Sequence, residues 1–210
     1  MWPMPLRNVA HEPQSVWEAL QAGNQRVLDG ETVDVREIYN REGLTHGQDP
    51  RVVVISCSDS RAPIEHVFNI GFGDAFVIRT AGHILDDAVV ASLDYALAGL
   101  KPNLLVVLGH QSCGAVGAAT GFVAGGELPT GLQRPIIEKV AASALVAGPN
   151  ATTDDVEREH TRQTVAQLVA SVPNVRRLRD EGALGGVGAR SLLEASSVET
   201  VLPRGGKAPP

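Results

Sequence analysis

Three short, continuous runs of apolar residues stand out along this chain. They cover residues 52–56, 75–78 and 104–108 and are rich in valine, isoleucine and leucine. Such runs are typical of strands that are buried on both faces, as in a parallel sheet. Two later runs, at 184–188 and 198–202, predict a fourth strand and its hairpin partner. The pattern therefore predicts a central, mostly parallel sheet of four strands with a C-terminal antiparallel edge strand.

Helical periodicity occupies the segments between these runs. Apolar residues recur at helical spacing in residues 15–28 and 86–100, and further helices are predicted near 135–146 and from 153 to about 172. A polar stretch after the first helix predicts a short helix around residues 35–39. Because strands alternate with helices, we expect an α/β fold in which helices flank the sheet.

The chain is expected to form one domain over residues 1–210. This length is sufficient to bury one hydrophobic core, and no internal repeat divides it. Residues 1–45 are expected to form an N-terminal helical arm. The tail at 203–210, rich in glycine and proline, has no periodicity and is expected to be frayed.

Composition and charge exclude several classes of function. A hydrophobic share of 43% excludes wholesale disorder, and a formal charge of −6 without a basic stripe argues against binding to nucleic acid or to an anionic membrane. No apolar run is long enough to span a bilayer. The first residues lack the pattern of a secretory signal, and two cysteines cannot form a disulfide framework. We therefore expect a soluble cytoplasmic protein.

Two cysteines and one histidine stand where strands of the predicted sheet end. Cys57 follows the first run, and His110 and Cys113 follow the third. Because the carboxyl ends of parallel strands meet at one edge of a sheet, the fold can bring these three side chains together. Two thiolates and one imidazole would form a neutral site for Zn²⁺. Such a site leaves a fourth position for water, which can ionise to a metal hydroxide.

Asp59 and Arg61 lie just beyond Cys57 and are separated by one residue. An arginine side chain can hold a carboxylate through two hydrogen bonds and keep it ionised. A carboxylate held in this way can accept a hydrogen bond from metal-bound water or, once freed, bind the metal itself. This pair is therefore the candidate for the catalytic groups of the site.

Simpler interpretations apply to each of these residues alone. A single cysteine is more often a small buried hydrophobic residue than a ligand, and an isolated Asp–Arg pair at a surface contributes little. Phosphatase, sulfurtransferase, redox-pair, deaminase and dinucleotide-binding motifs require spacings that this sequence lacks. The remaining histidines are expected to be exposed or satisfied by hydrogen bonds, namely His11, His46, His66, His83 and His160.

Two motifs resemble the signatures of the β-class carbonic anhydrases. They are Cys-Ser-Asp-Ser-Arg at 57–61 and His-Gln-Ser-Cys-Gly at 110–114. The run Phe-Val-Ile-Arg-Thr-Ala-Gly-His at 76–83 and the pair Asp94-Tyr95 are also similar to that family. The resemblance extends from the first predicted helix to the last hairpin and so covers nearly the whole chain.

This resemblance implies a role for each matching residue. Zn²⁺ would be bound by Cys57, His110 and Cys113. Asp59 and Arg61 would form the catalytic dyad. The reaction that the resemblance implies is the reversible hydration of carbon dioxide to bicarbonate and a proton.

A further group of residues matches the substrate pocket in the plant-like branch of that family, namely Gln48, Phe76, Ala81 and Tyr95. In the family these positions reach the metal of the neighbouring subunit, which implies a homodimer and leaves open the pairing of dimers. Val54 occupies the position where a bacterial branch with an inhibitory bicarbonate site has tryptophan. We therefore expect that regulatory site to be missing.

Two other functions remain open on the sequence alone. A hydrolase of carbon disulfide or carbonyl sulfide could use the same zinc ion and dyad. A homologue without activity could keep the zinc ion for a structural or regulatory purpose. The sequence does not identify a proton relay, for which His83 is one candidate.

Overall fold

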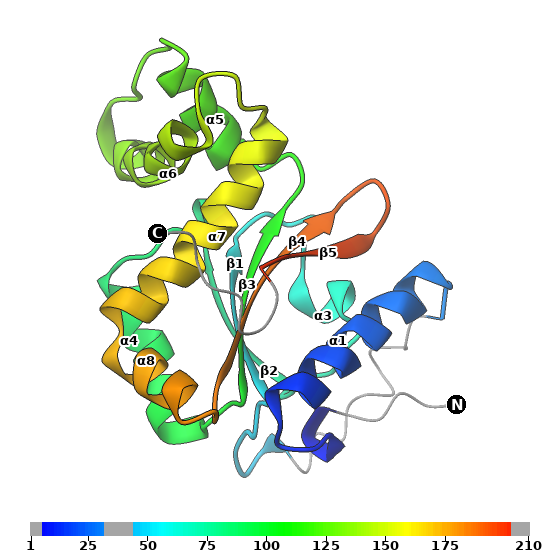
Figure 1. Cartoon of the computed structure of the whole chain (residues 1–210). Coiled ribbons are helices and arrows are strands. Elements are labelled where there is room, and N and C mark those ends of the chain that lie inside the picture. Colours follow the sequence, from blue (N-terminus) through cyan, green and yellow to red (C-terminus); the bar gives the residue numbers. More distant parts are fainter. Residues whose placement is uncertain (1–5, 32–43, 203–210) are drawn as a thin grey trace.

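The computed structural model describes residues 6–31 and 44–202 and contains a five-stranded sheet (Figure 1). The strands lie in the order β2-β1-β3-β4-β5. β1 pairs in parallel with β2 and β3, β3 pairs in parallel with β4, and β5 is antiparallel to β4. The strand bounds are Val52–Cys57 for β1, Ala75–Thr80 for β2, Leu104–His110 for β3, Gly185–Leu192 for β4 and Ser197–Leu202 for β5. The predicted α/β fold is confirmed.

Helices surround this sheet, as Figure 1 shows. One face packs against α4, α7 and α8, and the other packs against α1 and α3. The helix bounds are Pro13–Leu28 for α1, Ile64–Val67 for α3, Asp87–Tyr95 for α4, Gly114–Val123 for α5, Arg134–Ala147 for α6, Thr153–Ser171 for α7 and Pro173–Asp180 for α8. Short turns of other helix types are η1 (Leu6–Asn8), η2 (Ala81–His83), η3 (Ala96–Leu100) and η4 (Gly131–Gln133).

The two covered faces explain the continuous apolar runs. Successive side chains of a strand point to opposite faces of the sheet. Val53 and Ile55 of β1 belong to the core on the α4 and α7 face, whereas Val52 and Val54 belong to the core on the α1 face. Because helices cover both faces, most positions of β1 and β3 are apolar and buried.

The helical N-terminal segment packs on the sheet of its own chain. Trp17 and Leu20 of α1 are buried in the core with Val52 and Val54. Asn24 of α1 donates to the carbonyl oxygen of Val67 and accepts from the backbone N–H of Val198, at 2.9 and 3.0 Å. These contacts join α1 to α3 and to the last hairpin.

A separate helical layer stands beyond the carboxyl ends of the strands. α5 and α6 pack together there with the first turns of α7 (Figure 1). This third core contains Val116, Val140 and Val156, and it also contains Cys57 and Cys113. The helical layer therefore covers the edge of the sheet at which the candidate ligands stand.

Several element ends differ from the sequence-based prediction for identifiable reasons. α1 begins at Pro13, earlier than predicted, because proline suits the first turn of a helix, where its missing N–H is not needed. The same property lets Pro173 begin α8, where the sequence pattern predicted only a helix end. β3 extends to His110, so that this candidate ligand is the last residue of its strand. The short helix predicted around residues 35–39 and the tail at 203–210 lie outside the described residues.

No helix in residues 6–31 or 44–202 combines the length and apolar character needed to cross a bilayer. The longest of the helices there, α7, is not uniformly apolar, since its first half carries charged residues such as Asp154, Glu157 and Arg158.

Candidate metal centre

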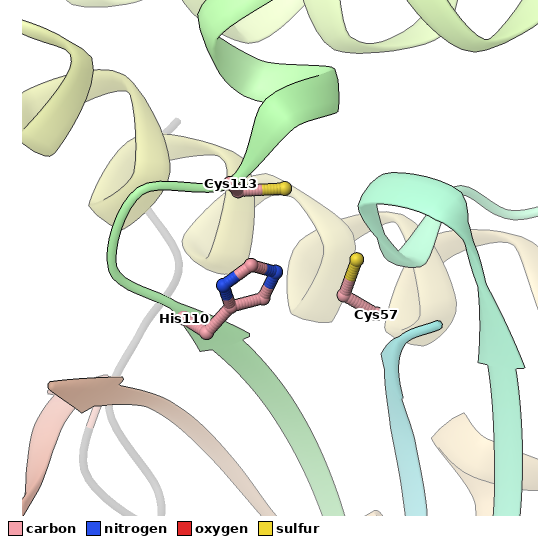
Figure 2. A group of neighbouring side chains, drawn as sticks. All are labelled: Cys57, His110 and Cys113. Carbon is pink, nitrogen blue, oxygen red and sulfur yellow. The ribbon is translucent and has the colours of Figure 1, made fainter. Parts of the chain in front are cut away.

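Three potential metal ligands meet at the carboxyl edge of the sheet. Cys57 is the last residue of β1, His110 is the last residue of β3, and Cys113 directly precedes α5. Their ligand atoms all lie within 4.8 Å of one another, and all three residues are buried. Figure 2 shows one ring nitrogen of His110 turned toward both sulfur atoms. The fold therefore brings together the three residues that the sequence singled out.

The histidine ring has the tautomer that a metal ligand needs. His110 Nδ1 lies 2.9 Å from the carbonyl oxygen of Gln111, which can only accept, so Nδ1 carries the proton. His110 Nε2 therefore presents a lone pair, and among the described residues this buried atom has no hydrogen-bond partner. A buried acceptor without a partner is costly. A cation between Nε2 and the two sulfurs would remove that cost, so the donor set fits a metal ion.

The two thiols differ in acidity because they share one hydrogen bond. The thiol of Cys113 donates to the sulfur of Cys57 and lowers the pKa of Cys57 to about 4. The same contact, reinforced by burial, raises the pKa of Cys113 well above its usual range. Without metal, the pair thus holds one proton at neutral pH. A divalent cation would replace that proton and be neutralised by the two thiolates.

Backbone around Gly82 supports the sulfur of Cys57. The N–H of Gly82 donates to Cys57 Sγ at 3.3 Å, and the Gly82 carbonyl accepts from His160 Nε2 at 2.9 Å. Gly82 has a φ of 64°, and a Cβ added there would lie 2.8 Å from Cβ of Ala115. Only glycine combines that left-handed backbone with such a close approach.

Asp59 and Arg61 form the ion pair with two hydrogen bonds that their spacing predicted. Arg61 donates from Nε to Asp59 Oδ1 at 2.9 Å and from Nη2 to Asp59 Oδ2 at 2.7 Å. These hydrogen bonds hold the pKa of Asp59 well below its usual range, so the carboxyl group is ionised at neutral pH. Asp59 Oδ2 lies 3.9 Å from His110 Nε2. The carboxylate is therefore held beside the space between the three ligands.

Two arginines connect the loop of the dyad to its surroundings. Arg61 also donates to the carbonyl oxygen of Ser112 at 3.1 Å, which joins the two sequence motifs. Arg79 of β2 donates to the carbonyl oxygens of Cys57 and Asp59 at 2.8 and 2.6 Å. Sequence reasoning gave Arg79 no role of its own, because the apolar run predicted as a strand ends one residue before it, whereas β2 continues to Thr80.

Comparison with known proteins decides the family. A solved structure titled as one of two tetrameric β-carbonic anhydrases from Sordaria macrospora has the same fold, with a TM-score of 0.71 at 21% identity over 91% of this chain and 98% of that chain. The sequence profile of the family described as carbonic anhydrase matches residues 52–198. This chain belongs to the β-carbonic anhydrase family.

Two curated relatives match most of the chain. It is 40% identical over 185 residues to carbonic anhydrase 2 of Mycobacterium tuberculosis, covering 87% of this chain and 89% of that protein. It is 44% identical over 159 residues to a carbonic anhydrase of Mycolicibacterium smegmatis, covering 74% and 77%. The reaction of the β-carbonic anhydrase family is the reversible hydration of carbon dioxide, and this chain is an enzyme of that family.

The four predicted pocket residues do not gather at one place within the chain. Phe76 pairs in register with Val53, four residues before Cys57, which places it about 13 Å from the metal edge along the strand. Tyr95 is 62% exposed, and its ring lies 6.3 Å from that of Phe76. Gln48 precedes β1 and is also exposed. These three therefore lie toward the amino end of the sheet, away from the candidate metal ligands of their own chain.

Ala81, the fourth predicted pocket residue, is placed differently. It follows the end of β2 and directly precedes Gly82, whose N–H contacts the sulfur of Cys57. Ala81 is exposed and, through its neighbour Gly82, lies close to the candidate ligand Cys57 of its own chain. Val54 lies fully buried within β1, so its side chain belongs to the core on the α1 face.

The other histidines divide into three groups. His11, His46 and His66 are exposed, as expected. His160 is buried and paired, with Ser143 Oγ 2.9 Å from its Nδ1. His83 contradicts the prediction, because it is 2% exposed and neither ring nitrogen has a hydrogen-bond partner among the described residues. It is enclosed beside the His160 ring at 4.4 Å, and burial lowers its pKa well below the usual range.

Proposed function

We propose that this chain hydrates carbon dioxide reversibly at a zinc ion held by Cys57, His110 and Cys113. The observation that carries the proposal is the meeting of these three ligand atoms within 4.8 Å at the edge of the sheet. Two sulfur ligands favour zinc over the harder divalent cations, and three protein ligands leave one position for water. When bound, zinc supplies the Lewis acidity that lets a water molecule lose its proton near neutral pH.

Asp59 orients the attacking oxygen in this proposal. As an ionised carboxylate it can only accept hydrogen bonds, so it selects an orientation in which the attacking oxygen points its hydrogen toward Asp59 and a lone pair toward carbon dioxide. Arg61 keeps the carboxylate in place through its two hydrogen bonds. Held by Arg61, Asp59 does not need to reorganise during the reaction.

A second copy of the chain completes the substrate pocket in this proposal. Phe76, Tyr95 and Gln48 lie too far along the sheet to line the pocket of their own chain, as described above. β2 is the edge strand of the sheet, and among the described residues no strand pairs with its outer side. Next to this open edge lies the exposed ring of Tyr95 of α4, which contacts the half-buried ring of Phe76 of β2, and such a surface is suitable for a partner. A homodimer would let Phe76 and Tyr95 enclose carbon dioxide and let Gln48 donate to its oxygen, and dimers could pair further.

We also propose that the enzyme works in the cytoplasm. Cys57 and Cys113 are both free thiols buried next to each other. A reducing compartment preserves such a pair for metal binding, whereas an oxidising one favours disulfides.

A stopped-flow hydration assay combined with metal analysis tests the function. The purified protein is expected to contain about one zinc ion per chain and to accelerate hydration, and removal of zinc by a chelator is expected to abolish the rate until zinc is restored. Carbon disulfide and carbonyl sulfide are assayed beside carbon dioxide. Faster turnover of either sulfur compound would contradict the assignment of carbon dioxide as the substrate. A zinc-replete protein that does not accelerate hydration would contradict the proposed activity.

A further inference from the structure

Arg190 of β4 is the largest fully buried side chain in the described part of the protein, at 0% exposure. Three carboxylates surround it. Its guanidinium group lies 2.6 Å from Glu157 Oε2, 2.6 Å from Asp154 Oδ1 and 3.1 Å from Glu199 Oε1. Glu157 is itself 1% exposed, whereas Asp154 and Glu199 lie nearer to solvent. Arg190 and Glu157 thus form a buried ion pair inside a larger charged cluster.

The net contribution of a buried ion pair to the free energy of folding is often small, so stability alone seldom explains why such a pair is present. The cost of taking both charges out of water often equals or exceeds their attraction, and apolar residues of similar volume can replace such pairs without loss. The position of Glu157 offers another reason for the pair. Its second carboxylate oxygen, Oε1, accepts a hydrogen bond from the backbone N–H of Cys113 at 2.9 Å.

We propose that Glu157, held by Arg190, is a positioning residue for the metal ligand Cys113. Each carboxylate oxygen of Glu157 has one task, since Oε1 binds the Cys113 N–H and Oε2 binds Arg190. The inference rests on the proposed function, because it takes Cys113 to be a ligand of zinc.

The local backbone explains why Cys113 needs this support. Ser112 has a φ of 57°, a left-handed conformation that only the surrounding structure can maintain in a residue other than glycine. The chain turns there from β3 into α5, and Cys113 immediately precedes the first turn of that helix. A fixed acceptor for the Cys113 N–H therefore fixes the direction in which its sulfur leaves the backbone.

The helix that carries Glu157 is docked on the strand that carries His110. Thr161 of α7 lies so close to Gly109 that a Cβ added to Gly109 would be 2.6 Å from Thr161 Oγ1. Thr161 Oγ1 in turn donates to the carbonyl oxygen of Glu157 at 3.0 Å. The close contact of Thr161 with Gly109 positions Glu157 relative to the neighbouring His110, and the hydrogen bond from Cys113 positions it relative to that residue. Glu157 therefore helps to fix the distance between His110 and Cys113.

Arg190 also makes the charge of Glu157 compatible with the site. An unpaired carboxylate behind Cys113 would repel the two thiolates that bind a metal ion. The guanidinium group of Arg190 compensates this charge without approaching the sulfurs, since it contacts only the oxygen of Glu157 that faces away from the Cys113 N–H.

Substitution of Glu157 by glutamine tests the proposal in the full-length protein. An amide of the same shape has one accepting oxygen and one donating nitrogen, so it cannot accept from Cys113 and from Arg190 together. The matched control is Asp154→Asn, which changes another contact of Arg190 without touching Cys113. Zinc affinity is measured by competition with a chromogenic chelator, and the stability of the metal-free proteins is measured by denaturant unfolding.

Glu157→Gln is expected to weaken zinc binding by about tenfold or more, in the range seen for groups that support metal ligands. Asp154→Asn is expected to leave zinc affinity within about twofold of the parent protein, because the Cys113 N–H keeps its acceptor. In the cobalt-substituted proteins, the sulfur-to-metal charge-transfer band is expected to shift in Glu157→Gln and to stay unchanged in Asp154→Asn. If Glu157→Gln folds poorly, Arg190→Met is measured in the same way and is expected to weaken zinc binding, because the charge of Glu157 is then uncompensated.

Equal zinc affinities and identical cobalt spectra for Glu157→Gln and the parent protein would overturn the inference. So would a loss of affinity that Asp154→Asn reproduces in proportion to its loss of stability, because the cluster would then be purely structural. A parent protein that binds no zinc would instead overturn the proposed function, so the two failures are distinguishable.

Discussion

Arg79 of β2 donates a hydrogen bond from Nε to the carbonyl oxygen of Cys57, the terminal residue of the neighbouring strand, at 2.8 Å. A second hydrogen bond from Nη2 to the carbonyl oxygen of Asp59, at 2.6 Å, continues the contact into the loop of the dyad. One guanidinium group thus fixes the candidate ligand Cys57 and the loop of Asp59 relative to each other.

Arg79→Met is expected to lower turnover while zinc stays bound. The carbonyl oxygens of Cys57 and Asp59 each lose the hydrogen bond from Arg79, which is expected to reduce the free energy of unfolding by about 1–3 kcal/mol. Denaturant unfolding and the hydration rate measure the two effects. Arg176→Met, a change of the same kind at an exposed position of α8, is the control and is expected to alter neither. Full turnover in Arg79→Met would show that the loop of Asp59 and Arg61 keeps its conformation without Arg79.

Asp59→Asn is expected to retain zinc and to lose turnover by about a hundredfold or more, because the amide no longer orients the attacking oxygen although its size is unchanged. Arg61 holds the pKa of Asp59 well below its usual range, so the carboxyl group of the parent protein is already ionised at neutral pH. A higher pH is therefore not expected to restore turnover in Asp59→Asn. Zinc content and the stopped-flow rate are measured on the same sample. A rate equal to that of the parent protein would refute the assigned role.

Cys113→Ala is expected to lower zinc content and to weaken folding, because a metal that binds only the folded chain stabilises it. At a zinc concentration 100 times the dissociation constant this stabilisation is about 2.7 kcal/mol. Unfolding curves with and without a chelator measure it, and the chelator is expected to destabilise the parent protein but not the variant. Full zinc occupancy in Cys113→Ala would mean that Cys113 is not a ligand.

Zinc binding is expected to release at least one proton near neutral pH. The pKa of Cys113 is raised, so its thiol still carries a proton when the metal-free protein is at pH 7, and the metal has to displace it. Cys57, with a pKa of about 4, is already a thiolate there. Apparent zinc affinity should therefore fall by about tenfold or more for each unit that the pH is lowered from neutrality. Chelator competition at several pH values checks this slope, and an affinity independent of pH would contradict the shared proton.

Mixing two inactive variants tests the shared substrate pocket. Tyr95→Arg removes the aromatic ring that is proposed to line the pocket of the partner chain. Asp59→Asn inactivates the site of the chain that carries it. In a mixed dimer, one of the two sites combines an intact Asp59 with an intact Tyr95. Random pairing makes half of the dimers mixed, so roughly a quarter of the parent activity is expected to return. If activity does not return although exchange of subunits is verified, Tyr95 does not contribute to the substrate pocket of the partner chain.

The sheet and its metal edge could be predicted from the sequence because both depend on local patterns. The apolar runs at 52–56 and 104–108 identify strands, and a ligand that follows such a run is carried to the same edge in any parallel sheet. The placement of Cys57, His110 and Cys113 therefore followed from their position in the chain alone.

The residues that support the ligands could not be predicted in this way. Arg79 and Glu157 act on residues far away in the sequence, and no local periodicity encodes such contacts. The burial of His83 depends likewise on its packing against His160 of α7. Arg79 and Arg190 lie just beyond the runs predicted as strands, at 75–78 and 184–188, so only the extended strands of the structure show them as charged residues that require partners.

The register of β2 against β1 has a consequence for how the enzyme behaves on dilution. Since Phe76 stands level with Val53, a solitary chain would keep its candidate ligands and the Asp59–Arg61 pair but would lack the partner residues that the proposal places around carbon dioxide. In the proposed dimer, specific activity would then depend on protein concentration and would decline once the copies separate. The metal would remain bound through that decline, because every ligand comes from the same polypeptide.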